Sequence, residues 1–318
     1  MDWHQLVEGV QRGERGSIAR ALTLVESNRP EHQQQARELL EHLPTGQPGG
    51  HRVGITGPPG VGKSSLIETL GLLAIQQGRR VGVLAIDPSS QRSGGSILGD
   101  KTRMEELSRS PQAFVRPSPA AGALGGVARR TREAMLLLEA AGYDLILVET
   151  VGVGQSEVAV AELVDSVLLL ALPGAGDDLQ GMKRGLMETA DLVFVNKADG
   201  ERLALARTTA NQLSLALRLL PARTPGWQVP VLTGSALQPE SLGPLYESLT
   251  RHRAFLGSDL TGLRAQQSVY WLERGLEQRL MDEFLNCHRE AWKQTRADVA
   301  AGRSTPEQAL QRFFGDRA

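Results

Sequence analysis

The segment from Gly57 to Ser64 constrains the fold more than any other stretch of the chain. It reads Gly-Pro-Pro-Gly-Val-Gly-Lys-Ser, follows the apolar run 52–56 and precedes an apolar helical pattern. Strand, glycine-rich loop and helix in this order are typical of a phosphate-binding loop, where glycines leave backbone N–H groups free to converge on phosphate oxygens. A surface turn is the alternative, but every position of the pattern G-x-x-x-x-G-K-[ST] is filled.

This loop predicts how a nucleoside triphosphate and its metal would be held. We expect Lys63 to neutralise the β- and γ-phosphates and to act in catalysis, and the Ser64 hydroxyl to bind a magnesium ion. The residues expected to bind nucleotide here are Gly57, Pro58, Pro59, Gly60, Val61, Gly62, Lys63, Ser64 and Ser65.

Short aliphatic runs alternate with longer amphipathic stretches after the loop, which predicts an α/β fold. Continuous Val/Ile/Leu runs separated by helices indicate a mostly parallel sheet flanked by helices on both faces. Ligands in such sheets lie at the carboxyl ends of the strands. Further strands are expected over residues 80–86, 113–116, 144–148, 166–172, 192–195 and 228–232.

The domain organisation is predicted from changes in this pattern. We expect an N-terminal helical arm over residues 1–47, a nucleotide domain over 48–256 and a C-terminal helical region over 257–318. Thr305 and Gln308 predict a capping box at the start of a last helix. The apolar residues at helical spacing in the C-terminal region either cover the sheet or form an oligomer interface. They are Val269, Leu272, Leu276, Leu280 and Phe284.

Composition narrows the possible partners. The 318 residues include 35 basic and 36 acidic ones, for a formal charge of -1, which does not favour binding to nucleic acid or to a membrane surface. No apolar run approaches the roughly 20 residues that cross a bilayer, so we expect a cytoplasmic protein. The single cysteine, Cys287, argues against a disulfide and a multi-cysteine metal cluster.

Two segments predict that the nucleotide is a guanine nucleotide. Asn196-Lys197-Ala198-Asp199 follows an apolar strand, and a carboxylate at Asp199 accepts from N1–H and the 2-amino group of guanine, donors that adenine lacks. We expect Lys197 to lie along the base and Asn196 to tie this loop to the phosphate-binding loop. The next strand end is expected to reach the guanine O6 through backbone N–H groups of Ser235, Ala236 and Leu237.

Acidic residues at two other strand ends predict a magnesium site. Asp87 and Glu149 each end an apolar run, and Asp100 lies in the loop between them. With Ser64, these three carboxylates are the expected metal ligands or hold the waters of the ion, and Glu149 is also expected to serve catalysis. For any one of these acids, the alternative is a helix cap or a solvated loop position.

At this point the sequence resembles the MeaB/ArgK family of P-loop GTPases. The resemblance rests on residues 87–90, 94–104 and 149–157 and extends over the nucleotide domain, although Ser65 stands where many relatives carry Thr. It implies a SIMIBI-type GTPase that binds GTP, GDP and magnesium. It also implies a chaperone of an adenosylcobalamin-dependent acyl-CoA mutase, typically methylmalonyl-CoA mutase, that gates cofactor loading, protects the mutase and forms a homodimer through its C-terminal helices.

Family members share a mobile segment that resembles residues 172–183 here. The resemblance suggests that it senses the γ-phosphate and reports to the partner through Asp177, Gln180 and Lys183, although an ordinary strand-to-helix connection would look similar. Gln155 is the candidate for positioning the attacking water.

Three other functions stay open. A kinase of the arginine/ornithine transport type would use the same loop but would need an acceptor pocket, and kinases usually prefer ATP. A metal-insertion GTPase of the nickel-delivery type shares the fold, yet six scattered histidines and one cysteine form no metal motif. A purely structural P-loop protein would not hydrolyse GTP.

Overall fold

The computed structural model describes residues 3–27, 29–43, 49–87, 104–119, 124–150, 160–174 and 184–315. The chain divides into two compact units, Met1–Gln267 and Ser268–Ala318. The domain limits expected from the sequence, after residues 47 and 256, stay predictions.

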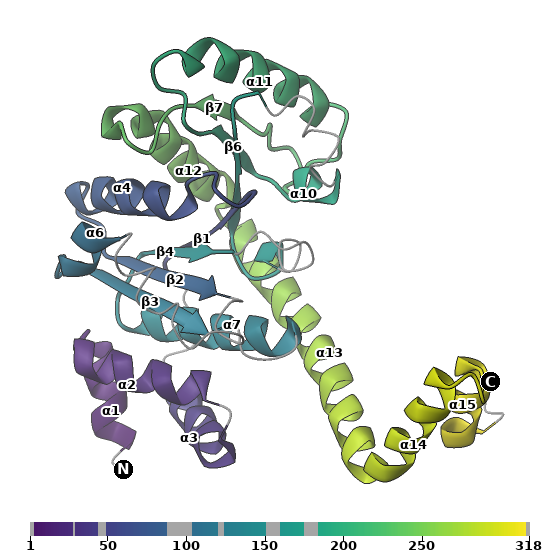
Figure 1. Cartoon of the computed structure of the whole chain (residues 1–318). Coiled ribbons are helices and arrows are strands. Elements are labelled where there is room, and N and C mark those ends of the chain that lie inside the picture. Colours follow the sequence, from purple (N-terminus) through teal and green to yellow (C-terminus); the bar gives the residue numbers. More distant parts are fainter. Residues whose placement is uncertain are drawn as a thin grey trace. The chain divides into compact units, whose positions relative to one another are not determined.

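The first unit is built on a parallel sheet, which confirms the predicted fold class (Figure 1). Among the described residues the sheet has seven strands in the order β3-β2-β4-β1-β5-β6-β7, and every pair of neighbours runs parallel. The strands are β1 (His51–Thr56), β2 (Val81–Asp87), β3 (Ala113–Pro119), β4 (Leu145–Glu149), β5 (Ser166–Ala171), β6 (Leu192–Val195) and β7 (Val231–Thr233).

Helices cover both faces of this sheet because its strands are apolar on both faces. In β5, Leu168 and Leu170 pack in a cluster that includes Leu66 of α4, whereas Leu169 and Ala171 pack in the cluster of α10 and α11. Successive strand residues point to opposite faces, so each face needs its own cover. The helices are α4 (Lys63–Gln76), α6 (Glu105–Arg109), α7 (Leu124–Ala140), α10 (Arg184–Glu188), α11 (Arg202–Leu217) and α12 (Gly243–Leu256), with the 3-10 turn η2 (Pro239–Leu242).

The last strand differs from its expected range of 228–232, since β7 begins only at Val231. Pro230 explains the late start, because proline has no N–H to donate to a strand ladder. Its carbonyl still accepts a hydrogen bond from Val193 N at 2.9 Å, so pairing with β6 begins at the proline oxygen.

Three N-terminal helices pack beside the edge strand β3 and helix α7. They are α1 (Trp3–Gln11), α2 (Arg15–Glu26) and α3 (Pro30–Glu41). Arg15 donates to the Ala113 carbonyl at 2.8 Å, and Glu26 forms an ion pair with Arg116 at 2.5 Å. The arm is therefore fastened to the edge of the sheet at two points of β3.

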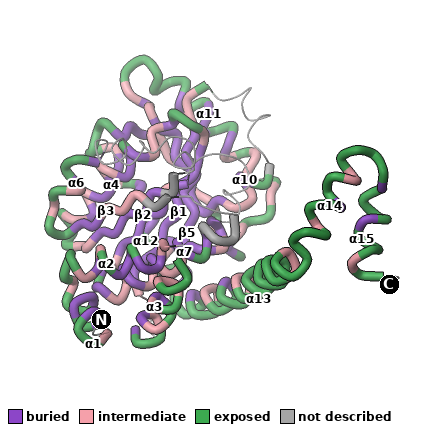
Figure 2. The backbone as a smooth tube through the Cα atoms, turned by 60° about the horizontal axis from the view of Figure 1, so that its bottom comes forward, coloured by how far each residue is buried: buried purple, intermediate pink, exposed green. Residues whose placement is uncertain are grey.

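In the second unit, the described residues form helices and the turns between them. Helix α13 (Asp259–Cys287) begins in the first unit, and α14 (Arg289–Ala300) and α15 (Pro306–Phe314) follow. The capping box predicted from Thr305 and Gln308 is confirmed at the start of α15. Of the apolar face predicted on α13, Val269, Leu272, Leu276 and Leu280 are exposed, with Leu272 71% accessible, as Figure 2 shows in green along the helix, whereas Phe284 is half-buried and stacks on Phe314. Among the described residues, no helix combines the length and apolar character that crossing a bilayer requires.

Candidate nucleotide site

The phosphate-binding loop follows β1 and leads directly into α4, with three glycines at positive φ. These are Gly57 at 145°, Gly60 at 75° and Gly62 at 97°. A Cβ at Gly57 would lie 2.6 Å from the Leu170 carbonyl oxygen, and one at Gly62 would lie 2.6 Å from Asn196 Nδ2. Glycine is therefore required at both positions by conformation and by close contact.

The lysine of the loop curls back over the loop itself. Lys63 Nζ donates to the carbonyls of Gly57 at 2.8 Å and Pro58 at 3.2 Å. The first backbone N–H groups of α4 have no partners inside the helix, and they lie beside this ammonium group at the positive end of the helix dipole. The arrangement can stabilise several negative charges of a polyphosphate.

Asn196, which follows β6, joins the loop after β6 to the phosphate-binding loop and to the loop after β7. Its Nδ2 donates to the Val61 carbonyl at 2.8 Å, and its Oδ1 accepts from Ala236 N at 2.9 Å. The side chain is 1% exposed, so both bonds are shielded from water. Lys197 adds a second tie, with Nζ donating to the Gly60 carbonyl at 2.7 Å from a residue at φ 59°.

Asp199 is half-buried at the carboxyl edge of the sheet. Ala198 N donates to the Gly234 carbonyl at 3.0 Å, which brings Asp199 beside the loop after β7. Within the described part of the chain, no hydrogen bond or ion pair holds the Asp199 carboxylate. Its oxygens can therefore accept from a bound base.

The backbone N–H groups of the loop after β7 already donate within the chain. Ser235 N donates to Ser241 Oγ at 2.9 Å and Ala236 N to Asn196 Oδ1 at 2.9 Å. Leu237 N donates to Ser235 Oγ at the longer distance of 3.3 Å, and the Leu237 side chain is 80% exposed. Of the three residues expected at the guanine O6, Leu237 therefore has the N–H most readily available to a ligand.

Ser64 and Glu149 lie together at the ends of α4 and β4. Ser64 Oγ donates to Glu149 Oε1 at 2.9 Å. The strand register places Glu149 beside Ile55 of β1 and Ala85 of β2. A hydroxyl and a carboxylate in contact are oxygen donors of the kind that magnesium prefers, so these residues fit the ion.

The remaining acidic positions are only partly visible. The backbone of Asp87 ends β2, two residues beyond the pairing partner of Glu149, but its side chain lies outside the described residues, as does all of Asp100. Among the residues that are described, no group of three or more His, Cys, Asp and Glu could hold a metal ion. The buried hydroxyl of Thr56, the last residue of β1, has no hydrogen-bond partner there.

The expected water-positioning and switch residues cannot be compared with the structure. Gln155, Asp177, Gln180 and Lys183 all lie outside the described residues. Their roles stay predictions.

One contact at the site has no counterpart in the sequence analysis. Thr69 Oγ1 on α4 donates to the Ala236 carbonyl at 2.7 Å, which fastens the loop after β7 to the helix of the phosphate-binding loop. The two residues are separated by 167 positions. A threonine in a helix also commonly bonds its own i−4 carbonyl, as Thr69 does with Ser65 at 3.1 Å, so the sequence held no signal for the longer link.

Comparison with known proteins gives a consistent family. Residues 18–289 match the model of the methylmalonyl Co-A mutase-associated GTPase MeaB. A probable GTPase of Mycobacterium tuberculosis is 50% identical over 97% of this chain and 93% of its own length. The GTPase ArgK of Escherichia coli is 45% identical over 88% of this chain and 86% of its own length.

A mouse protein and a solved structure agree with this. The mitochondrial methylmalonic aciduria type A homolog of Mus musculus is 43% identical over 88% of this chain and 70% of its own length. A crystal structure described as an LAO/AO transport system kinase is 35% identical, with a TM-score of 0.78, and covers 98% of this chain and 95% of its own. The chain belongs to the MeaB family of methylmalonyl Co-A mutase-associated GTPases and is a GTP-hydrolysing enzyme.

Proposed function

We propose that this GTPase is a magnesium-dependent chaperone of an adenosylcobalamin-dependent acyl-CoA mutase, specifically methylmalonyl-CoA mutase. In this role it gates the loading of the cofactor and protects or reactivates the mutase. The proposal is supported by the family description, which names that mutase, and by the relatives named for methylmalonic aciduria.

The observation that carries the nucleotide part of the proposal is the pair of hydrogen bonds made by Asn196. One side chain holds the phosphate-binding loop through Val61 and the loop after β7 through Ala236. A ligand that spans both loops must present phosphates at one end and a base at the other. With the Asp199 carboxylate free to accept, guanine fits and adenine leaves the carboxylate without donors.

Hydrolysis in this site is in-line attack of water on the γ-phosphorus of GTP. A bond forms between the water oxygen and phosphorus, and the bond from phosphorus to the β,γ-bridging oxygen breaks, leaving GDP and phosphate. Lys63 and the N–H groups of Gly60 to Ser65 stabilise the charge on the transferring group. Ser64 and Glu149, with Asp87 and Asp100, would hold a magnesium ion, which would supply positive charge to the phosphates.

The residues that we propose for water positioning and partner sensing lie outside the described residues. Gln155 orients the water, and Asp177, Gln180 and Lys183 report the state of the γ-phosphate to the mutase.

Two copies of the chain associate through the C-terminal helices, which is supported by the exposed apolar face of α13 formed by Val269, Leu272, Leu276 and Leu280. The expected location is the cytoplasm.

A kinase is the second candidate, because the solved relative at 35% identity is described as a transport system kinase. A kinase transfers the γ-phosphoryl group to an acceptor other than water. Labelled γ-phosphate recovered only as inorganic phosphate, with arginine, ornithine or protein present, would exclude it.

The experiment that tests the chaperone role uses the full chain and purified methylmalonyl-CoA mutase. We expect a complex in the presence of a non-hydrolysable GTP analogue, and GTP hydrolysis at least about tenfold faster with the mutase than without it. The variant Lys63→Ala is the control that retains the fold but hydrolyses poorly. No complex in any nucleotide state, together with a turnover rate that the mutase leaves unchanged, would refute the role.

A further inference from the structure

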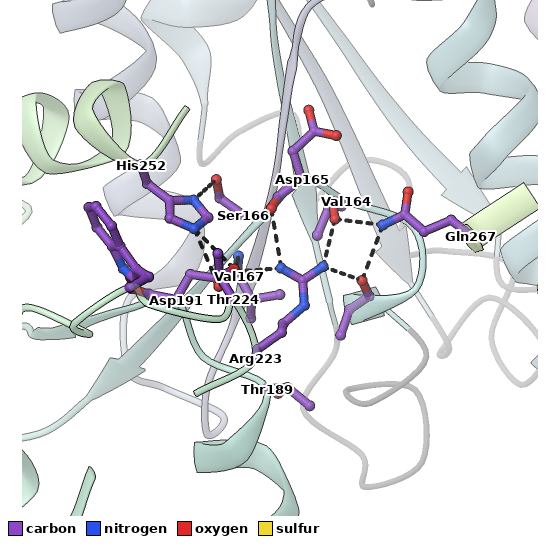
Figure 3. Close-up of polar contacts among 12 residues, drawn as sticks. Val164, Asp165, Ser166, Val167, Thr189, Asp191, Arg223, Thr224, His252 and Gln267 are labelled. Atoms are coloured by element: carbon purple, nitrogen blue, oxygen red, sulfur yellow. Dashed lines mark hydrogen bonds and ion pairs between the residues drawn. The ribbon is translucent and has the colours of Figure 1, made fainter. Parts of the chain in front are cut away.

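The amino ends of β1, β5 and β6 hold a buried set of charged and polar side chains that the nucleotide site does not use (Figure 3). They lie at the edge of the sheet opposite to the phosphate-binding loop, because the strands are parallel. Two of its members come from the first turns of α13, a helix that the sequence assigned to the C-terminal region. These are Arg264 and Gln267.

Arg264 contacts three other elements of the first unit. Its Nε and Nη2 donate to the two carboxylate oxygens of Asp165 at 2.9 and 2.7 Å, and Nη2 also donates to the Gly50 carbonyl at 2.6 Å. Its Nη1 lies 3.1 Å from Glu139 Oε1 at the end of α7. Only 13% of the Arg264 side chain is exposed, and paired charges this well shielded depend on their geometry.

Asp165 also bonds to β1, so it links Arg264 to that strand. Its Oδ2 accepts from Arg52 N, and its own N donates to the Arg52 carbonyl, both at 2.9 Å. Burial opposes ionisation of Asp165, but the hydrogen bonds and charge of Arg264 and the Arg52 N–H together hold the pKa of its carboxyl below the ordinary value. Asp165, directly before β5, therefore continues the pairing of β5 with β1 through its backbone N–H and its charged side chain.

Gln267 acts on the turn that precedes Asp165. Its Nε2 donates to the carbonyls of Val164 at 2.9 Å and Ala161 at 3.5 Å, and Arg223 Nη2 donates to the same two oxygens at 2.9 and 2.6 Å. Figure 3 shows the two side chains converging on Val164. Both carbonyls belong to buried residues and need hydrogen-bond donors, so these side chains fix where the turn 161–164 lies.

The turn packs directly on the strand that leads to the phosphate-binding loop. A Cβ at Gly54 of β1 would lie 2.8 Å from Val160 Cγ1 and 3.0 Å from Val164 Cγ2, so the turn and the strand are in close contact there. Gly54 stands three residues before Gly57. The carbonyl of Ile55, the residue after Gly54, accepts a hydrogen bond from Thr150 N at 3.1 Å, and Thr150 directly follows Glu149.

We propose that Arg264 and Gln267 are positioning residues for GTP hydrolysis. By holding the turn 161–164 and Asp165 against β1, they set the placement of the phosphate-binding loop relative to Glu149. Misplacing reacting groups by about 1 Å costs on the order of a hundredfold in rate, so a small shift of β1 against this turn lowers turnover. Residues 151–159 lie outside the described residues and are no part of the proposal.

The test measures kcat and KM for GTP with the full chain and magnesium, without the mutase, so its outcome does not depend on the proposed chaperone role. We expect Arg264→Met to lower kcat about tenfold while KM stays within about twofold, since binding groups are retained. Arg264→Lys keeps the charge but loses the two-pronged contact, and we expect it to recover part of the rate. Gln267→Leu removes the donor without changing charge, and we expect kcat about threefold lower.

The matched control is Arg274→Met, on the same helix, where the arginine is 53% exposed and pairs with Glu277. We expect it to leave kcat and KM unchanged. Each rate is measured well below the variant's own midpoint of thermal unfolding. If Arg264→Met and Gln267→Leu lower that midpoint but retain the wild-type kcat, or raise KM alone, the residues are merely structural and the proposal is wrong. Should Arg264→Met not fold, Arg264→Lys and Gln267→Leu decide in the same way.

Discussion

The two edges of the sheet use polar residues in opposite ways. At the carboxyl edge, the cations Lys63 and Lys197 donate to backbone carbonyls, and the Asp199 carboxylate has no partner among the described residues. At the amino edge, the carboxylates of Asp165 and Asp191 are fully buried and meet arginines at 2.7 and 2.5 Å. The first edge leaves the Asp199 carboxylate available to a ligand, and the second satisfies the charges of Asp165 and Asp191 within the chain.

Because of this difference, we expect substitutions at the carboxyl edge to change ligand binding and substitutions at the amino edge to change stability. A charge that awaits a ligand can be altered with little effect on folding, whereas removing one partner of a buried pair leaves the other charge desolvated. The two edges should therefore respond differently to the same kind of change, namely the removal of one carboxylate.

The largest effect is expected at the carboxyl edge, from Asp199→Asn. The new amide presents an N–H where guanine also has donors, so GTP affinity should fall about ten thousandfold, roughly 5 to 6 kcal/mol, while xanthosine triphosphate gains affinity. Calorimetric titration with both nucleotides measures the exchange.

Glu201→Gln, two residues further and exposed, is the matched control and should leave GTP affinity unchanged. The unfolding midpoint without nucleotide should also be unaltered by Asp199→Asn. Undiminished GTP binding by that variant would show that Asp199 does not contact the base.

Asp191→Ala makes the corresponding change at the amino edge and should act on stability. Asp191 is fully buried and accepts from Arg223, from Val167 N at 2.9 Å and from Thr224 at 2.7 Å. Its loss leaves the Arg223 charge without its carboxylate, so the free energy of unfolding should fall by about 3–5 kcal/mol.

Urea denaturation of the full chain measures this loss. Glu105→Ala removes an exposed carboxylate that pairs with Arg109, and a change within about 0.5 kcal/mol is expected there. Equal losses for the two variants would remove the distinction between buried and exposed charge.

The fold could be predicted from the sequence because the apolar pattern of its strands matches the burial that the folded sheet requires. A run such as Val167 to Leu170 is apolar at every position, and a strand covered on both faces buries all of it. The start of β7 was placed too early because apolar content alone does not register the missing N–H of Pro230.

The two edges differ in how far the sequence predicts them. The carboxyl edge is encoded in short motifs, so Lys63, Ser64, Asn196 and Asp199 are brought together where parallel strands end. The amino edge carries no motif. Arg264 meets Asp165 across 99 positions, and nothing in the spacing of 35 basic and 36 acidic residues distinguishes that pair from any other. Only the folded chain selects it.

Gly54→Ala tests the strand that connects the two edges. The added methyl group would meet Val160 and Val164 at 2.8 and 3.0 Å, so side chains or backbone must move, at a cost of about 1–3 kcal/mol in the free energy of unfolding. Gly262→Ala on α13 meets nothing within 4 Å and should gain stability instead, as Ala usually does in a helix. Thermal denaturation compares the two. An unchanged midpoint for Gly54→Ala would mean that Val160 and Val164 do not pack tightly against β1.

The smallest effect concerns the pH dependence of the amino edge. Burial lowers the pKa of His51 to about 3, and the ring bonds to Ser166 Oγ at 2.6 Å, so His51 is neutral in the folded chain at every pH above that value. In the unfolded chain its pKa is about 6.5. Between these values the unfolded state binds the additional proton, so the contribution of His51 makes the folded chain less stable as the pH falls below 6.5.

His51 contributes a slope of at most about 1.4 kcal/mol per pH unit to the free energy of unfolding. Burial also lowers the pKa of His252, which contributes in the same direction. His51→Gln keeps a group that can bond Ser166 but does not titrate. Urea denaturation from pH 6.5 to 5, above the range where carboxylates titrate, should therefore show a shallower loss for the variant. Parallel curves for the two proteins would mean that the His51 ring takes up a proton in the folded chain as readily as in the unfolded chain, which would contradict its burial as a neutral group at the amino edge.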